Sequence, residues 1–117
     1  MYDEGLNGLA RKCHDMAVEK GWYDTKRSFP ELIALCHSEL SEALEAYREN
    51  HGDVNAQWVD EDGTQPGKPE GVPSELADTI IRILDMCGFY EIDIDAAIEE
   101  KMRYNATRSY RHGNKAC

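Results

Sequence analysis

The sequence predicts an all-α protein, on three observations. Apolar residues recur three and four positions apart over four separate stretches of the 117-residue chain. Helix-start and helix-end signals flank these stretches, and no stretch shows the convincing alternation of a β-strand. A chain of this length has room for one hydrophobic core, so we expect residues 1–117 to form a single domain, a small four-helix bundle.

The first two predicted helices have clear ends. The first runs from about Asp3 to Lys20, and Gly21 ends it as a C-terminal cap residue. The second begins at Ser28, because Ser-Phe-Pro-Glu is a capping box with proline in the first turn. It continues to about Asn50.

A long segment, residues 51–72, separates the second predicted helix from the third. It is rich in glycine, proline and acidic residues and has little periodicity, so we predict a long loop. Loops of this length inside compact domains are usually functional or mobile. The third helix is expected from about Pro73–Ser74 to Cys87, where Gly88 ends it.

The fourth predicted helix begins at Asp93 or Asp95 and leads into a basic tail, residues 109–117. The net charge of −10 is unevenly distributed, because residues 1–100 contain all 23 acidic residues. Residues 101–117 contain five basic residues and no acidic one. So acidic a chain is a poor candidate for binding nucleic acid, but its basic end is suited to the phosphates of a small ligand.

The sequence favours a cytoplasmic protein without a membrane partner. No stretch approaches the roughly 18 apolar residues of a membrane span. The first residues, MYDEGLNG, are acidic where a secretory signal would be basic and then apolar. The four cysteines are far apart and lack zinc or disulfide spacing, so we expect buried free thiols.

One carboxylate lies inside an apolar helix face. Around the axis of the second predicted helix, Glu39 falls between Leu32 and Leu35. Glu42, one turn later, lies on the same side, so the two carboxylates converge. Adjacent, partly buried carboxylates repel one another and resist ionising unless a cation is close.

The third predicted helix repeats the arrangement with Glu75 and Asp78. Two antiparallel helices would bring four carboxylates together, and such an oxygen-rich site suits Mg²⁺, with Mn²⁺ as the alternative ion. Glutamate is also a common helix former on solvated faces, so the residues alone leave surface charge as the other interpretation. A di-iron bundle is set aside because no histidine follows a glutamate at the required spacing.

The end of the fourth helix carries a second group of polar residues. Lys101, Asn105 and Arg108 are spaced so that a continuing helix places them on one face. Lysine and arginine bind phosphate oxygens, and asparagine can contact a base or sugar edge. Without a metal site nearby, a solubilising C-terminal tail is the simpler interpretation.

Together, these residues resemble the MazG-like nucleoside triphosphate pyrophosphohydrolases, an all-α superfamily that includes dCTP pyrophosphatase. The family pattern of E-x-x-E followed by E-x-x-D reads ELSE at 39–42 and ELAD at 75–78. The pattern K-x-x-x-N-x-x-R reads KMRYNATR at 101–108. Trp22 resembles an aromatic residue of the dCTP pyrophosphatase branch, whereas Arg82 stands where that branch tends to have an aromatic side chain.

The resemblance implies a MazG-like four-helix bundle that forms a dimer or tetramer. It implies Mg²⁺-dependent hydrolysis of a nucleoside or deoxynucleoside triphosphate to the monophosphate and pyrophosphate. The implied metal-binding and catalytic residues are Glu39, Glu42, Glu75 and Asp78. The implied substrate-binding residues are Lys101, Asn105, Arg108, Trp22 and Arg82.

Two alternatives remain open. One is phosphoribosyl-ATP pyrophosphohydrolase, an enzyme of the same superfamily. The other is a non-catalytic helical dimerisation or scaffold module whose acidic residues are surface charge. That module would gain no stability from metal ions and would keep its function after Glu39→Gln.

Overall fold

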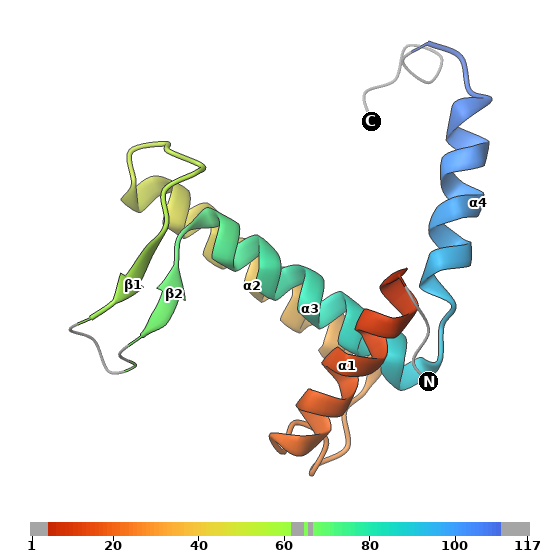
Figure 1. Cartoon of the computed structure of the whole chain (residues 1–117), viewed down its shortest axis with the longest axis horizontal. Helices are drawn as coiled ribbons and strands as arrows, with labels where there is room; N and C mark the ends of the chain where they lie inside the picture. Colours follow the sequence, from red (N-terminus) through yellow and green to blue (C-terminus); the bar gives the residue numbers. More distant parts are fainter. Residues whose placement is uncertain (1–4, 62–64, 66, 111–117) are drawn as a thin grey trace.

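The computed structural model describes residues 5–61, 65 and 67–110, and these are mostly helical, as the sequence predicts. The helices are α1 (Gly5–Glu19), α2 (Phe29–Glu49), α3 (Val72–Tyr90) and α4 (Ile94–Ala106). Two short strands, β1 (Trp58–Asp60) and β2 (Lys68–Glu70), lie between α2 and α3. Helix α3 is central, because it contacts α2 along one side and α1 along another (Figure 1).

The predicted C-terminal end of α1 and the predicted start of α2 agree with the structure, whereas the predicted start of the first helix, Asp3, lies outside the described residues. Gly21 follows α1 with a φ of 88°, a left-handed conformation that glycine adopts without strain. The Ser28 hydroxyl caps α2 by accepting a hydrogen bond from the Glu31 backbone N–H (3.2 Å). The Glu31 carboxylate pairs with Arg27 (2.6 Å), which stabilises the same turn.

The prediction that Gly88 ends the third helix is wrong. Helix α3 continues to Tyr90 and ends at Glu91, which has a left-handed φ of 55°. Gly88 lies within the helix, where an added Cβ would lie 2.7 Å from the Ala10 carbonyl oxygen. The glycine therefore permits the close approach of α1 and α3, beside a small core of Ala10, Leu84 and Cys87.

The prediction of a loop without strands over residues 51–72 is also wrong. Strands β1 and β2 pair antiparallel, with Trp58 opposite Glu70. Gly71 joins β2 to α3 at a φ of 115°, and a Cβ there would clash with the Ala56 carbonyl oxygen. The hairpin is consequently fixed beside the first turn of α3.

Within one chain, α4 does not complete a four-helix bundle. It buries none of its residues, and its neighbour is α1 (Figure 1). Hydrogen bonds connect the N-terminal turns of these two helices. Asp95 accepts hydrogen bonds from the backbone N–H groups of Leu6 (3.0 Å) and Asn7 (2.9 Å), and the Asn7 side chain accepts one from Ile94 (3.0 Å).

Helices α2 and α3 each leave an apolar stripe uncovered. The residues of the two stripes are Leu40, Leu44, Tyr47, Leu76, Ile80 and Ile83. Ile80 is 53% exposed and Leu40 is 51% exposed, although the sequence places both on apolar faces. By helical spacing, both stripes lie on the opposite side of the α2–α3 pair from Glu42 and Asp78. None of the described helices is long and apolar enough to cross a membrane.

Candidate metal centre

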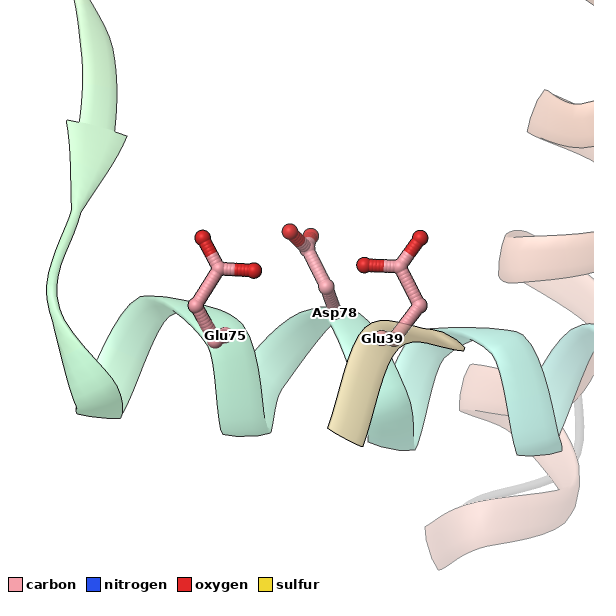
Figure 2. A group of neighbouring side chains, drawn as sticks. All are labelled: Glu39, Glu75 and Asp78. Atoms are coloured by element: carbon pink, nitrogen blue, oxygen red, sulfur yellow. The ribbon is translucent and has the colours of Figure 1, made fainter. Parts of the chain in front are cut away.

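Three of the four predicted carboxylates converge in the structure. Glu39 of α2 and Glu75 and Asp78 of α3 each offer an oxygen, and these three atoms lie within 4.8 Å of one another. Figure 2 shows the three side chains pointing to the same side of α3. The arrangement follows from the sequence, because the i, i+3 pair on α3 meets Glu39 where the antiparallel helices touch.

The fourth carboxylate, Glu42, lies at the edge of this group. It lines the same cleft as the other three, but it is not among the side chains whose oxygens lie within 4.8 Å of one another. Its charge still acts on the group, since it is one of the charges that affect the pKa of Glu75. The structure thus places all four predicted acids in one cleft and brings oxygens of three of them within 4.8 Å of one another.

Glu75 is in an unfavourable environment for an isolated carboxylate. It is only 6% exposed. Burial is the main cause that raises the pKa of Glu75, and the neighbouring charges of Asp78 and Glu42 raise it further. A bound cation would relieve both effects.

The donor set fits Mg²⁺. Oxygen ligands of Mg²⁺ lie about 2.1 Å from the ion, so two of them are at most about 4.2 Å apart. The three carboxylate oxygens lie within 4.8 Å of one another, so a shared ion would require the farthest pair to close by no more than roughly half an ångström. Three carboxylates also provide the hard, anionic oxygens that Mg²⁺ and Mn²⁺ prefer.

The acids lie in a cleft of about 650 Å³ formed by α1, α2, β2 and α3. This volume is within the range of small-molecule sites. Among its described lining residues are five carboxylates and four cationic side chains. The cationic ones are Lys12, Lys20, Lys68 and Arg82. A cleft with both signs of charge is suited to a ligand that brings metal ions and anionic groups together.

Two of the predicted substrate-binding residues, Trp22 and Arg82, lie at one end of this cleft. The Arg82 guanidinium carbon is 3.6 Å from the centre of the Trp22 ring, and Arg82 Nε is 3.6 Å from a Glu39 oxygen. A second arginine, Arg27, stabilises the backbone position of Trp22, because Arg27 Nε donates a hydrogen bond to the Trp22 carbonyl oxygen (2.7 Å). The aromatic ring and the carboxylates are therefore linked through one arginine.

The other predicted substrate-binding residues are not in the cleft of the same chain. Lys101 and Asn105 are exposed on α4, which is separate from the acids. The predicted helical face does not include Arg108, because α4 ends at Ala106 and the Arg108 guanidinium lies over the Tyr104 ring at 5.7 Å. Most of the predicted basic tail, residues 111–117, lies outside the described residues.

Sequence reasoning missed a buried polar network around Asp85. This residue is 4% exposed, and its two oxygens meet His14 Nδ1 (2.9 Å) and the Tyr23 hydroxyl (2.9 Å). Burial, followed by the hydrogen bond to Asp85, raises the pKa of Tyr23 well above its usual range. The signal was present, since Asp85 interrupts the apolar run IIRILDMCGFY in the same way as Glu39 interrupts its own helix face.

Lys68 was missed for a different reason. It belongs to the segment predicted as a loop, where helical or strand periodicity gives no direction for a side chain. The hairpin brings it to the cleft beside Glu42 and Glu75.

Comparison of the chain with protein-family models, with curated proteins and with solved structures finds no match.

Proposed function

We propose that this protein is a Mg²⁺-dependent nucleoside triphosphate pyrophosphohydrolase with a MazG-like fold. The convergence of Glu39, Glu75 and Asp78 in a cleft that also presents an aromatic ring and four cations carries this proposal. Carboxylates alone would repel a triphosphate, and cations alone would not need to bury an acid such as Glu75. The two together match a substrate that binds with metal ions.

Glu39, Glu75 and Asp78 would hold Mg²⁺, or Mn²⁺ in its place, with Glu42 at the rim of the site. The bound ion would polarise phosphate oxygens and lower the pKa of a water molecule. The protein's own part is to fix the carboxylates on two rigid helices and to neutralise the phosphates with lysine and arginine. Trp22, which lines the cleft, would be the aromatic ring that contacts the nucleoside base.

The proposed reaction consumes one water molecule and releases the nucleoside monophosphate and pyrophosphate. The water oxygen forms a bond to the α-phosphorus while the bond from that phosphorus to the α,β-bridging oxygen breaks. Pyrophosphate leaves with the electron pair of that bond. The proton of the attacking water passes to a carboxylate of the cleft, which acts as general base.

We further propose that the active form is a dimer or tetramer. The uncovered stripes on α2 and α3 include Leu40 and Ile80, each about half exposed, and a second copy would bury them. Because Lys101, Asn105 and Arg108 lie outside the cleft of their own chain, a role in substrate binding requires that they reach the cleft of another copy.

The test is a hydrolysis panel of the common nucleoside and deoxynucleoside triphosphates, with phosphoribosyl-ATP as a separate arm. Each reaction is run with Mg²⁺ and with EDTA, and the products are separated to distinguish pyrophosphate from phosphate. We expect metal-dependent release of a monophosphate and pyrophosphate by the wild type, and none by Glu39→Gln or Asp78→Asn.

The matched control is Glu45→Gln, which removes an exposed glutamate that pairs with Arg48 on α2, outside the lining of the cleft. Its turnover should equal that of the wild type. Activity with phosphoribosyl-ATP alone would favour the alternative function, phosphoribosyl-ATP pyrophosphohydrolase. No turnover of any substrate, together with no effect of Mg²⁺ on the melting temperature, would favour the scaffold module and refute the enzyme proposal.

A further inference from the structure

We propose that Lys68, on strand β2, binds the pyrophosphate end of the substrate, so that the nucleoside lies at Trp22 and the terminal phosphates lie beneath the β-hairpin. This inference rests on the proposed function, because it assigns a direction to the same substrate in the same cleft. It also assigns a role to a residue that neither the acidic motifs nor the basic motif contains.

The cleft has two distinct ends along α3. Figure 2 shows the strand that leads into α3 rising beside Glu75, with Asp78 and Glu39 farther along the helix, toward α1. Arg82 lies one turn after Asp78 on α3, and its guanidinium packs against the Trp22 ring. From Glu75 to Arg82 the helix rises by about 10 Å, so the hairpin end and the tryptophan end are well separated.

Lys68 is held at the hairpin end. Gly71 joins β2 directly to the first turn of α3. Glu75, the first residue of the acidic motif, lies in that turn. The Lys68 ammonium lies 3.4 Å from a Glu70 oxygen, and its side chain is 46% exposed. It lines the cleft, and after the nearer effects of Glu70, the charges of Glu75 and Glu42 also contribute to raising the pKa of Lys68.

Lys68 thus adds a positive charge to the lining of the cleft that also contains the carboxylates that would hold the metal. Once a divalent ion neutralises Glu75, the ammonium of Lys68 is attracted less by the carboxylates and is available to phosphate oxygens. The leaving pyrophosphate gains negative charge as the bond to the α-phosphorus breaks. A lysine at its end of the cleft would stabilise that charge.

The opposite orientation of the substrate is disfavoured by the position of the aromatic residues. Trp22 lines the cleft at the Arg82 end, where a base can stack. The tryptophan of the hairpin, Trp58, is not among the residues that line the cleft. Lys12 lies on α1, as do the apolar Leu9 and Met16 of the lining, and Lys20 directly follows that helix. The hairpin end is thus the place for phosphates, and the α1 end is the place for the nucleoside.

The experiment measures the binding of each product separately by isothermal titration calorimetry of the full chain with excess Mg²⁺. The ligands are inorganic pyrophosphate and the common nucleoside monophosphates. For Lys68→Gln we expect pyrophosphate affinity to fall about tenfold or more, since one charge-assisted contact is lost, with monophosphate affinity unchanged. For Trp22→Ala we expect the affinity for the nucleoside monophosphates to fall and the affinity for pyrophosphate to be unchanged.

Two further variants make the result specific. Lys26→Gln removes the same charge from an exposed position outside the cleft lining and should leave both affinities unchanged. Glu70→Gln removes the ion-pair partner of Lys68 but keeps the ammonium, so pyrophosphate affinity should be retained or increased. Glu70→Gln also keeps the inference testable if Lys68→Gln disturbs the hairpin.

The inference is overturned if Lys68→Gln binds pyrophosphate as well as the wild type does, or if it loses both products equally. Absence of pyrophosphate binding by the wild type, or a loss of it in Glu70→Gln, also overturns it. The hydrolysis panel keeps this failure distinct from failure of the proposed function. Metal-dependent turnover by the wild type with unchanged pyrophosphate binding by Lys68→Gln refutes the role of Lys68 alone.

Discussion

Replacing Glu75 with glutamine is expected to stabilise the metal-free protein. Glu75 is 6% exposed, and its oxygen lies within 4.8 Å of those of Asp78 and Glu39. Two like charges at that distance repel by about 3.5 kcal/mol at an effective dielectric constant of about 20. Arg82 and Lys68 offset part of this repulsion, so we expect a net gain of about 1–3 kcal/mol near neutral pH. For 117 residues this corresponds to a rise in Tm of about 4–12 °C.

The gain should depend on pH in a defined direction. The pKa of Glu75 is raised in the folded protein above its ordinary value of 4.5, so the folded state holds a proton that the unfolded state has released. The stability contributed by this protonation is fully present below pH 4.5 and is lost as the pH rises through the folded-state pKa. Glu75→Gln lacks this loss, so its advantage over the wild type should be largest at neutral pH and should disappear in acid.

Magnesium should reverse the order of stability. At a Mg²⁺ concentration a hundredfold above Kd, a ligand that binds only the folded state stabilises it by about 2.7 kcal/mol, or about 11 °C in a chain of 117 residues. Glu75→Gln should gain much less, because it has lost a ligand oxygen. Thermal unfolding followed by circular dichroism, with EDTA or Mg²⁺ across the pH range, measures all three effects. The exposed Glu45→Gln serves as control.

A metal-free Glu75→Gln protein less stable than the wild type at neutral pH would refute the argument from charge repulsion. An equal gain from Mg²⁺ in both proteins would refute the role of Glu75 as a ligand.

The remaining predictions concern the fold and the assembly. Asp85→Ala should lower stability by about 2–4 kcal/mol, because it leaves Tyr23 and His14 without their buried partner, and chemical denaturation measures the loss. Gly88→Ala should cost about 1–3 kcal/mol by forcing α1 away from α3, and chemical denaturation measures this loss too. Ile80→Glu should yield monomers in light scattering if the uncovered stripes join two copies. If Lys101 acts on the cleft of another copy, mixing inactive Glu39→Gln with Lys101→Ala should restore part of the turnover. Turnover of the mixture no higher than the sum of the two separate variants would contradict that role.

The sequence predicts helix ends well where a local side-chain contact makes them, and poorly where a distant segment decides. Ser28 caps α2 through a hydrogen bond three residues away, which the spacing of the capping box already contains. Gly21 and Gly88 both follow an apolar helical run. Gly21 has a positive φ and ends its helix, whereas Gly88 stays helical because Ala10 of another helix occupies the space of its missing side chain. That contact has no local signature.

The candidate site shows the same division. Glu39, Glu75 and Asp78 were found because helical geometry fixes the direction of each side chain, and antiparallel neighbours then bring them together. Lys68 was not found, because strands of three residues are too short to show alternation and β2 contains a proline. A shared face for Lys101 and Arg108 requires the helix to continue to residue 108, but α4 ends at Ala106.

Arg82 explains how the carboxylates remain together without a metal ion. Its guanidinium pairs with Glu39 at one end of the group, and Lys68 lies at the other end beside Glu75. An aromatic side chain at position 82 would stack on Trp22 but would neutralise nothing. From Arg82, through the carboxylate group, to Lys68, the charges along the cleft are therefore positive, negative and positive. A triphosphate placed on this row meets repulsion only in the middle, and a divalent ion at Asp78 removes that repulsion. The proposed function consequently requires metal dependence, because without the ion the cleft repels the substrate at the position where its α-phosphate must lie.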